Sequence, residues 1–502
     1  MPQSNWTDGV TRSRFGIHCN IIFWLLAPLY WLCPRPEILL ILTSCACALA
    51  GFGIYLISRK KIGNSWWAII PAVSFWLSPM VQDANLYDFH VVTLATVLFV
   101  WMIWAFDSGR IKAGWALLAL TLMCKENMPL LIAMYGIYLL LDRKRNLGIA
   151  VIIISIFYIV FINNFFVPFF TGGKGLWSSR VNRYLWLGPR LSEAPVNLIR
   201  YAPQILSQIL QPDRLRIVIY FLLSGGIVAF LGWRMLLLLI PPLMESLLSN
   251  SVWTTRITGA YYFIVPEAII ILACILAAQK ASFPLRKIIL LYLLTVTIFF
   301  SLAFSPLPYG SGSYLDNYAL NKEAHKVLKE LSSSIPPDAS ICTQNNLGPH
   351  FSHRLHIGRF PYYLKTADYV LLYLRRTSGT NSGYFMRPSL AILPGDVNPK
   401  TLDIFLESGA ADWKLVSSKQ GFYLFIRGRS SAQEWEAIKK STRDDLAIMV
   451  SQYIRDSRHE SKLAPYLTGT MTWKELRSNW KAVLKSWSDL LVRLKTCLLY
   501  QL

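Results

Sequence analysis

The chain has 502 residues, of which 54% are hydrophobic and 14% aromatic, and its mean hydropathy is +0.39. This composition excludes a single water-soluble domain and is typical of a polytopic membrane protein. The formal net charge of +22 would suit nucleic acid, but the basic residues gather in short breaks beside apolar segments, as anionic lipid headgroups and cytoplasmic retention demand. We therefore expect membrane lipid as a partner and no nucleic acid.

The first apolar segment, 21–32, is short and contains Pro28. Because proline interrupts a helix and Trp and Tyr prefer the headgroup layer, we favour a helix on the outer face over a very short crossing. Residues 1–18 then lie outside. No cleavable signal pattern opens the chain, so we expect that a first span, needed to export this end, is missing upstream of Met1.

Apolar segments predict about nine to eleven membrane segments, some short or re-entrant, within a membrane domain over residues 1–304. We place them at 37–57, 66–81, 89–106, 114–124 with 128–141, 148–168, 217–232, 235–249, 261–279 and 288–304. The breaks that hold Arg59–Lys61, Arg110, Arg143–Arg145, Arg234 and Lys280–Lys287 are assigned to the cytoplasm by the positive-inside rule. The opposite breaks, including a long loop at 169–216, then face outward.

The composition changes after Ser305. Residues 305–320 read as a linker, and 321–430 as a small extracytoplasmic α/β domain with helices at 321–334 and 400–408. Its expected strands are 339–343, 369–374, 413–417 and 422–427. Residues 431–502 form a basic helical tail with Trp473, Trp480 and Trp487 at intervals of seven; it lies on a membrane surface or packs on the preceding domain.

The richest group of ionisable residues precedes the span at 89–106. Asp83, Asp88 and His90 occur where charge is costly unless it is paired or functional. A carboxylate beside an imidazole suits a general base or a divalent-cation site, so Asp83 and Asp88 are candidate ligands for Mg²⁺ or Mn²⁺. The alternative is that these aspartates only cap the helix that follows.

Lys125 and Glu126 interrupt an apolar hairpin of about 28 residues. A lysine at the membrane boundary suits a lipid phosphate, although a snorkelling lysine beside a glutamate would look the same. Candidate binding residues in other predicted outer segments are Arg183, Tyr184, Glu245 and Tyr261. Glu245 interrupts an apolar stretch, whereas arginines among aromatic residues in one loop are a weak signal.

Several short motifs occur in a fixed order over residues 15–427. They are Phe15-Gly16-Ile17-His18, Ala27-Pro28-Leu29-Tyr30, Tyr87-Asp88-Phe89-His90, Lys125-Glu126-Asn127, Arg183-Tyr184, Leu187-Gly188, Leu248-Ser249, Tyr261-Tyr262 and the run from Pro349 to Arg354. Together they resemble a prokaryotic family of multi-pass membrane proteins of unknown function. That family is itself similar to the GT-C glycosyltransferases, which take sugars from polyprenyl-phosphate carriers on the outer face.

The resemblance implies a GT-C-like helix bundle in the inner membrane, an acid in the first outer loop as base, a second acid before a later span, and a lysine at the carrier phosphate. Asp88 matches the second acid and Lys125 the lysine. The first acid has no counterpart, because Asp8 is too close to His18.

The leading hypothesis is a glycosyltransferase-like protein that takes a sugar from a polyprenyl-phosphate carrier. Asp88 acts as base or metal ligand, Lys125 contacts the donor phosphate, and His18 and His90 orient the acceptor. The alternative is a transporter or a lipid-binding scaffold. Transporters commonly show internal repeats and charges near the midplane, whereas these charges fall at one interface, which favours the enzyme.

Overall fold

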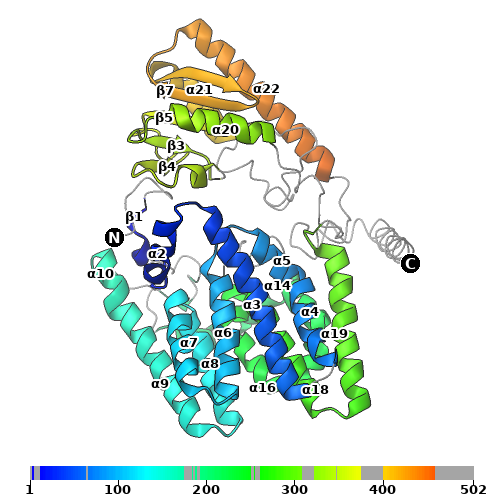
Figure 1. Cartoon of the computed structure of the whole chain (residues 1–502). Helices are drawn as coiled ribbons and strands as arrows, with labels where there is room; N and C mark the ends of the chain where they lie inside the picture. The colour runs from blue at the N-terminus through cyan, green and yellow to red at the C-terminus, as the bar shows by residue number, and fades with distance from the viewer. Residues whose placement is uncertain are drawn as a thin grey trace, which may run out of the picture. The chain divides into compact units, whose positions relative to one another are not determined.

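The computed structural model describes residues 3–4, 12–63, 66–174, 184, 187–188, 193–249, 254, 261–307, 322–345, 347–374 and 399–457 (Figure 1). The chain divides into two compact units. We call the described part of residues 14–312 the membrane unit, and the described part of residues 313–460 with 3–4 and 12–13 the α/β unit.

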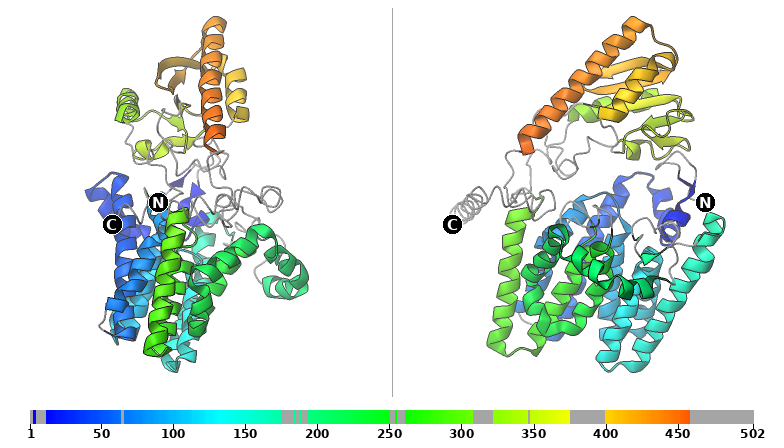
Figure 2. Two further views of the ribbon diagram at one scale, coloured as in Figure 1. Left: turned by 90° about the vertical axis from the view of Figure 1, so that its right-hand side faces the viewer. Right: turned by 180° about the vertical axis from the view of Figure 1, so that it is seen from behind.

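The membrane unit is built from helices. They are α1 (Arg14–Ile17), α2 (Phe23–Leu32), α3 (Glu37–Ile62), α4 (Ile70–Leu77), α5 (Pro79–Leu86), α6 (Val91–Asp107), α7 (Ile111–Cys124), α8 (Met128–Leu141), α9 (Arg145–Phe161), α10 (Val167–Thr171), α12 (Ala194–Arg200), α13 (Ala202–Ile209), α14 (Pro212–Phe221), α15 (Ile227–Ala229), α16 (Trp233–Leu236), α17 (Ile240–Leu247), α18 (Ile264–Lys280) and α19 (Phe283–Phe304). Figure 2 shows the same helices from two further sides.

Four helical segments of the described chain are long and apolar enough to cross a membrane: Glu37–Ile62, Arg145–Thr171, Ile217–Leu247 and Phe283–Phe304. The third is not straight. The Arg214 guanidinium donates a 2.9 Å hydrogen bond to the Ser249 carbonyl, so the chain between these residues runs into the bundle and returns. A straight helix of this length would hold its ends roughly 46 Å apart.

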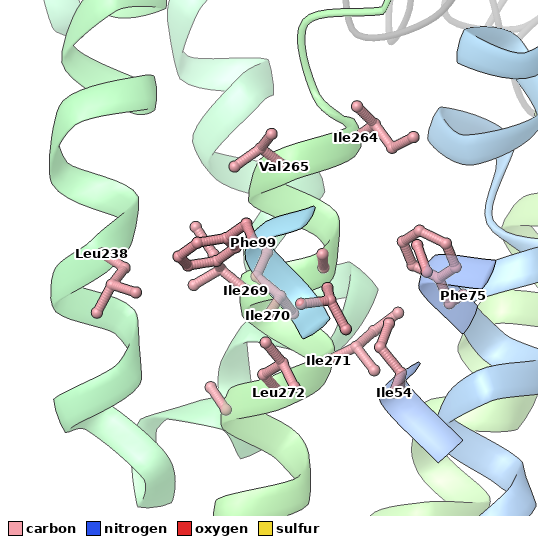
Figure 3. Close-up of a cluster of buried hydrophobic side chains, with 14 of the residues drawn as sticks. Ile54, Phe75, Phe99, Leu238, Ile264, Val265, Ile269, Ile270, Ile271 and Leu272 are labelled. Atoms are coloured by element: carbon pink, nitrogen blue, oxygen red, sulfur yellow. The ribbon is translucent and has the colours of Figure 1, made fainter. Parts of the chain in front are cut away.

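Helix α18 forms the centre of the membrane unit. Nearly all of its residues from Ile264 to Ala278 are buried, as expected for a helix that is apolar on every side. In Figure 3, Ile269 and Ile270 lie toward Leu238, and Ile271 lies toward Ile54 and Phe75. The neighbouring helices α3, α4, α6 and α16 all contact α18, so its backbone has little room to move.

The α/β unit contains a five-stranded sheet of order β4-β3-β5-β7-β6. The strands are β3 (Ile341–Thr343), β4 (Ile357–Arg359), β5 (Tyr369–Tyr373), β6 (Trp413–Lys419) and β7 (Phe422–Arg427). The first three are parallel, and β7 pairs antiparallel with β5 and β6. A separate short pair joins β1 (Gln3–Ser4) and β2 (Arg12–Ser13).

The sheet is covered on both faces. Alternate residues of a strand point to opposite faces, and Val370 packs in the cluster of α21 (Pro399–Ser408) and α22 (Ala432–Ser457). The next residue, Leu371, packs instead with α20 (Lys322–Ser334). The unit therefore has three layers, with one helix on one face of the sheet and two helices on the other.

Most helices and strands lie within a few residues of the positions predicted from the sequence. The segment predicted as a long outer loop at 169–216 contains helices that were not predicted: α10 extends to Thr171, and α12 and α13 cover 194–209. Strand β4 was not predicted; it has three residues and is defined by its pairing with β3. Trp473, Trp480 and Trp487 lie outside the described residues.

Asp368 links two strands of the α/β unit. Its carboxylate accepts hydrogen bonds from the Ser340 hydroxyl at 2.6 Å and the Ser340 backbone N–H at 2.9 Å. These bonds hold the pKa of the Asp368 carboxyl below its ordinary value of 3.8. A depressed pKa stabilises the folded state above the unfolded pKa, and this stabilisation is lost as the pH falls through the folded pKa.

We expect Asp368→Asn to lower the stability of the α/β unit at pH 7 by less than about 1 kcal/mol, since the site is exposed to solvent. The difference from wild type should shrink as the pH falls below the ordinary pKa of 3.8 and disappear below the folded pKa, where the carboxyl is protonated in both states. Protease susceptibility of the full chain in denaturant, measured across pH, tests this. A difference that persists at low pH would contradict the linkage.

Candidate functional site

The turn between α7 and α8 is held by the segment that precedes α2. His18 Nδ1 lies 3.0 Å from Glu126 Oε1, and the Cys19 backbone N–H donates to Glu126 Oε2 at 3.3 Å. The Asn20 amide donates to the Cys124 carbonyl at 2.6 Å, and the Ile22 N–H to the Met123 carbonyl at 2.9 Å. The structure therefore brings together His18 and Glu126, which are 108 residues apart in the chain.

Lys125 lies in this turn and is only 9% exposed. Its ammonium is 5.9 Å from the centroid of the Tyr261 ring and 5.8 Å from that of Tyr262. This ammonium makes no hydrogen bond or ion pair with any residue that the structure describes. The neighbouring carboxylate, Glu126, is held by His18 and Cys19 instead. A buried ammonium is costly unless an anion compensates it.

Asp88 and His90 approach Lys125 through Tyr261. His90 Nδ1 lies 3.1 Å from Asp88 Oδ1, and the His90 ring stacks on Tyr261 with centroids 3.5 Å apart. Tyr87 contacts both rings edge-on, at 5.3 Å from His90 and 5.5 Å from Tyr261. The Asp88 side chain is 61% exposed. An imidazole is therefore fixed between a tyrosine and an accessible carboxylate.

The alternative that Asp88 only caps the next helix is wrong, because the N-cap residue of α6 is His90 and no side-chain capping bond is made there. Asp83 does not cap α6 either. It lies within α5, wholly buried, and its backbone carbonyl accepts the Tyr87 N–H at 3.0 Å.

Glu245 lies on the other side of the turn. Asn127 Nδ2 donates to Glu245 Oε2 at 2.6 Å, and the Tyr184 hydroxyl donates to the Glu245 carbonyl at 3.2 Å. The carboxylate thus ties α17 to the start of α8. Arg183, the remaining predicted binding residue, lies outside the described residues.

The predicted site residues in the described chain, Asp83 apart, gather around one turn. We use the name lysine site for Lys125, Tyr261, Tyr262, His90 and Asp88. The contribution of Tyr87 and Tyr262 was not predicted residue by residue, although both belong to the short motifs that carried the resemblance. Aromatic residues in the predicted outer segments, beside the other candidate residues, are a signal that could have identified them.

The donor set does not favour a resident divalent cation. Within the described ranges, no three His, Cys, Asp or Glu side chains gather closely enough to hold a metal ion. Asp83 is buried in α5 while Asp88 follows that helix with an exposed side chain. The Mg²⁺ or Mn²⁺ site at Asp83 and Asp88 stays a prediction.

Fold and site together define an integral membrane protein with an ionisable site at one end of its helix bundle. The chain belongs to the family described as predicted membrane protein (DUF2079), whose model matches residues 2–382. That match includes every residue of the lysine site. No curated protein matches the chain.

Proposed function

We propose that this protein transfers a sugar from a polyprenyl-phosphate carrier at the outer face of the inner membrane. The observation that carries the proposal is Lys125, a residue only 9% exposed whose ammonium has no anionic partner in the described chain. A phosphate supplies the missing negative charge beside the stacked Tyr261 and Tyr262 rings.

The depth of the turn supports a lipid-borne phosphate. Helices α7 and α8 have 14 residues each and so extend about 21 Å, less than a bilayer core of roughly 30 Å. Non-helical backbone at membrane depth is tolerated where protein buries it or a cavity is lined by it. Lys125 would then meet a headgroup that a membrane lipid presents from the side.

The basic end of the bundle supports the proposed orientation. At the far ends of α6 and α8, Lys61 and Lys144 pair with Asp107 at 3.0 and 3.4 Å, and Arg286 donates to the Ile62 carbonyl at 3.2 Å. The positive-inside rule assigns this end to the cytoplasm. The lysine site, at the opposite end of α8, and the chain that follows α19 would then be extracytoplasmic.

The chemistry we propose is a single displacement. Asp88 accepts the proton of the acceptor hydroxyl while the acceptor oxygen bonds to the anomeric carbon. The bond between that carbon and the carrier phosphate oxygen breaks, and the released negative charge develops beside Lys125. His90, fixed by Asp88 and Tyr261, and His18, fixed by Glu126, orient the acceptor.

Membranes that carry the protein, incubated with a panel of polyprenyl-phosphate sugars, test the proposal. We expect carrier-dependent sugar transfer or release, reduced about 10²- to 10⁴-fold in Asp88→Asn, since this removes the base. Asp142→Asn is the matched control, because Asp142 also follows a helix and lies close to a basic side chain, that of Lys144, at 3.7 Å. Undiminished turnover in Asp88→Asn would sink the assignment.

A further inference from the structure

A second ionisable group lies deeper in the membrane unit and has no part in the proposed transfer. Glu267 belongs to the first turn of the central helix α18 and is 2% exposed. Its Oε2 atom has no hydrogen-bond partner, and no described Lys, Arg or His forms an ion pair with it. The Ser78 hydroxyl lies close to the Glu267 carboxyl and also close to the Tyr220 hydroxyl.

Ser78 marks a break in a membrane helix. Helix α4 ends at Leu77 and α5 begins at Pro79, and Ser78 between them has extended backbone angles. The Trp76 carbonyl at the break is satisfied by the Gln82 amide at 3.1 Å. The Leu77 carbonyl, in contrast, accepts no hydrogen bond from any residue in the described ranges. The buried Ser78 hydroxyl lies close to Glu267 and Tyr220 but makes no hydrogen bond of regular geometry within those ranges.

These groups share a chemistry. A carboxylate oxygen, a hydroxyl and a backbone carbonyl are all oxygen donors, which hard cations prefer. Each would cost free energy if it stayed buried without a partner. In membrane proteins, interrupted helices commonly coordinate Na⁺ through such carbonyls. A single carboxylate matches a single positive charge.

We propose that Glu267, Ser78 and the Leu77 carbonyl bind a monovalent cation, Na⁺, at the break between α4 and α5. This goes beyond the proposed transfer and does not depend on it. Bound Na⁺ would neutralise Glu267 and hold α18 against the broken helix. Tyr261 and Tyr262 of the lysine site lie just before α18. By fixing the start of α18, the cation would therefore also help to position these two tyrosines.

The test is the melting temperature of the full-length protein in detergent, followed by tryptophan fluorescence at pH 8. NaCl replaces choline chloride at constant ionic strength. We expect the melting temperature of the wild type to rise with Na⁺ concentration and then saturate, because a ligand that binds only the folded state stabilises it. Glu267→Gln keeps the shape of the side chain but should lose the response. Glu37→Gln, at an exposed acid in the first turn of α3, should keep it.

Ser78→Ala keeps the experiment decisive if Glu267→Gln does not fold. In this variant we expect the Na⁺ concentration at half of the full rise in melting temperature to be about tenfold or more higher, as for loss of a group that supports a metal site. Absence of any Na⁺ response in the wild type at pH 8 would overturn the proposal. Two other results would also overturn the proposal. One is a melting temperature that rises only as the pH falls, since a proton and not Na⁺ would then neutralise Glu267. The other is a rise with divalent cations only.

Discussion

Replacement of Lys125 by alanine is expected to abolish high-affinity binding of polyprenyl phosphate. Lys125 is only 9% exposed, and its ammonium lies beside Tyr261 and Tyr262 with no anionic partner in the described chain, so the proposed phosphate makes its charge-assisted contacts there. Loss of one partner of a buried charge pair costs about 2–5 kcal/mol, which corresponds to roughly 30- to 5,000-fold in affinity. Binding of a fluorescent polyprenyl phosphate to the protein in nanodiscs measures it.

Two further variants make this result specific. Lys125→Arg retains the charge but changes the geometry, so we expect an intermediate affinity. Lys144→Ala removes a lysine at the basic end of the bundle, where it pairs with Asp107, and should leave binding unchanged. Equal losses in Lys125→Ala and Lys144→Ala would mean that charge alone, not the lysine site, attracts the lipid.

The second large effect concerns folding. Gly232→Ala is expected to destabilise the membrane unit by about 3 kcal/mol, because an added Cβ would lie 2.2 Å from the Ala273 carbonyl oxygen. Ala273 belongs to α18, which is buried on nearly every side, so its backbone cannot shift away cheaply. Reversible unfolding in mixed micelles of increasing SDS content measures the change.

Gly428→Ala is the matched control for this substitution. Its added Cβ would meet only the Lys414 Cβ, at 3.7 Å, which is an ordinary van der Waals contact. We therefore expect no measurable loss from it. Wild-type stability in Gly232→Ala would show that the folded-back segment does not pack on α18 as closely as described.

The sequence predicted those site residues whose charge is energetically costly in or beside an apolar segment. Lys125, Glu126 and Glu245 interrupt apolar stretches, and Asp88 and His90 stand just before one, so each was singled out. What the pattern could not supply was pairing across the chain. Glu126 bonds to His18, and Glu245 bonds to Asn127, 118 residues away. Such pairs depend on how the helices pack, which spacing alone does not determine.

Glu267 carried the same signal and was missed. It is an acid in the first turn of an apolar helix and lies within the predicted span at 261–279, but it was not singled out there. The helices at 194–209 were missed for another reason. They are short and lie among prolines and arginines, where single-sequence periodicity is weak. Strand β4 has only three residues and no pattern of its own.

The most direct test of the account is a cryo-electron microscopy structure of the protein in nanodiscs with a bound polyprenyl phosphate. We predict that its phosphate lies within hydrogen-bond distance of the Lys125 ammonium, with the first isoprene units running out between helices into the lipid. Two results would contradict the lysine site as a carrier-phosphate site. One is density for the phosphate at the opposite, basic end of the bundle, beside Lys61 and Lys144. The other is the absence of ordered lipid near Lys125 at a saturating concentration of polyprenyl phosphate.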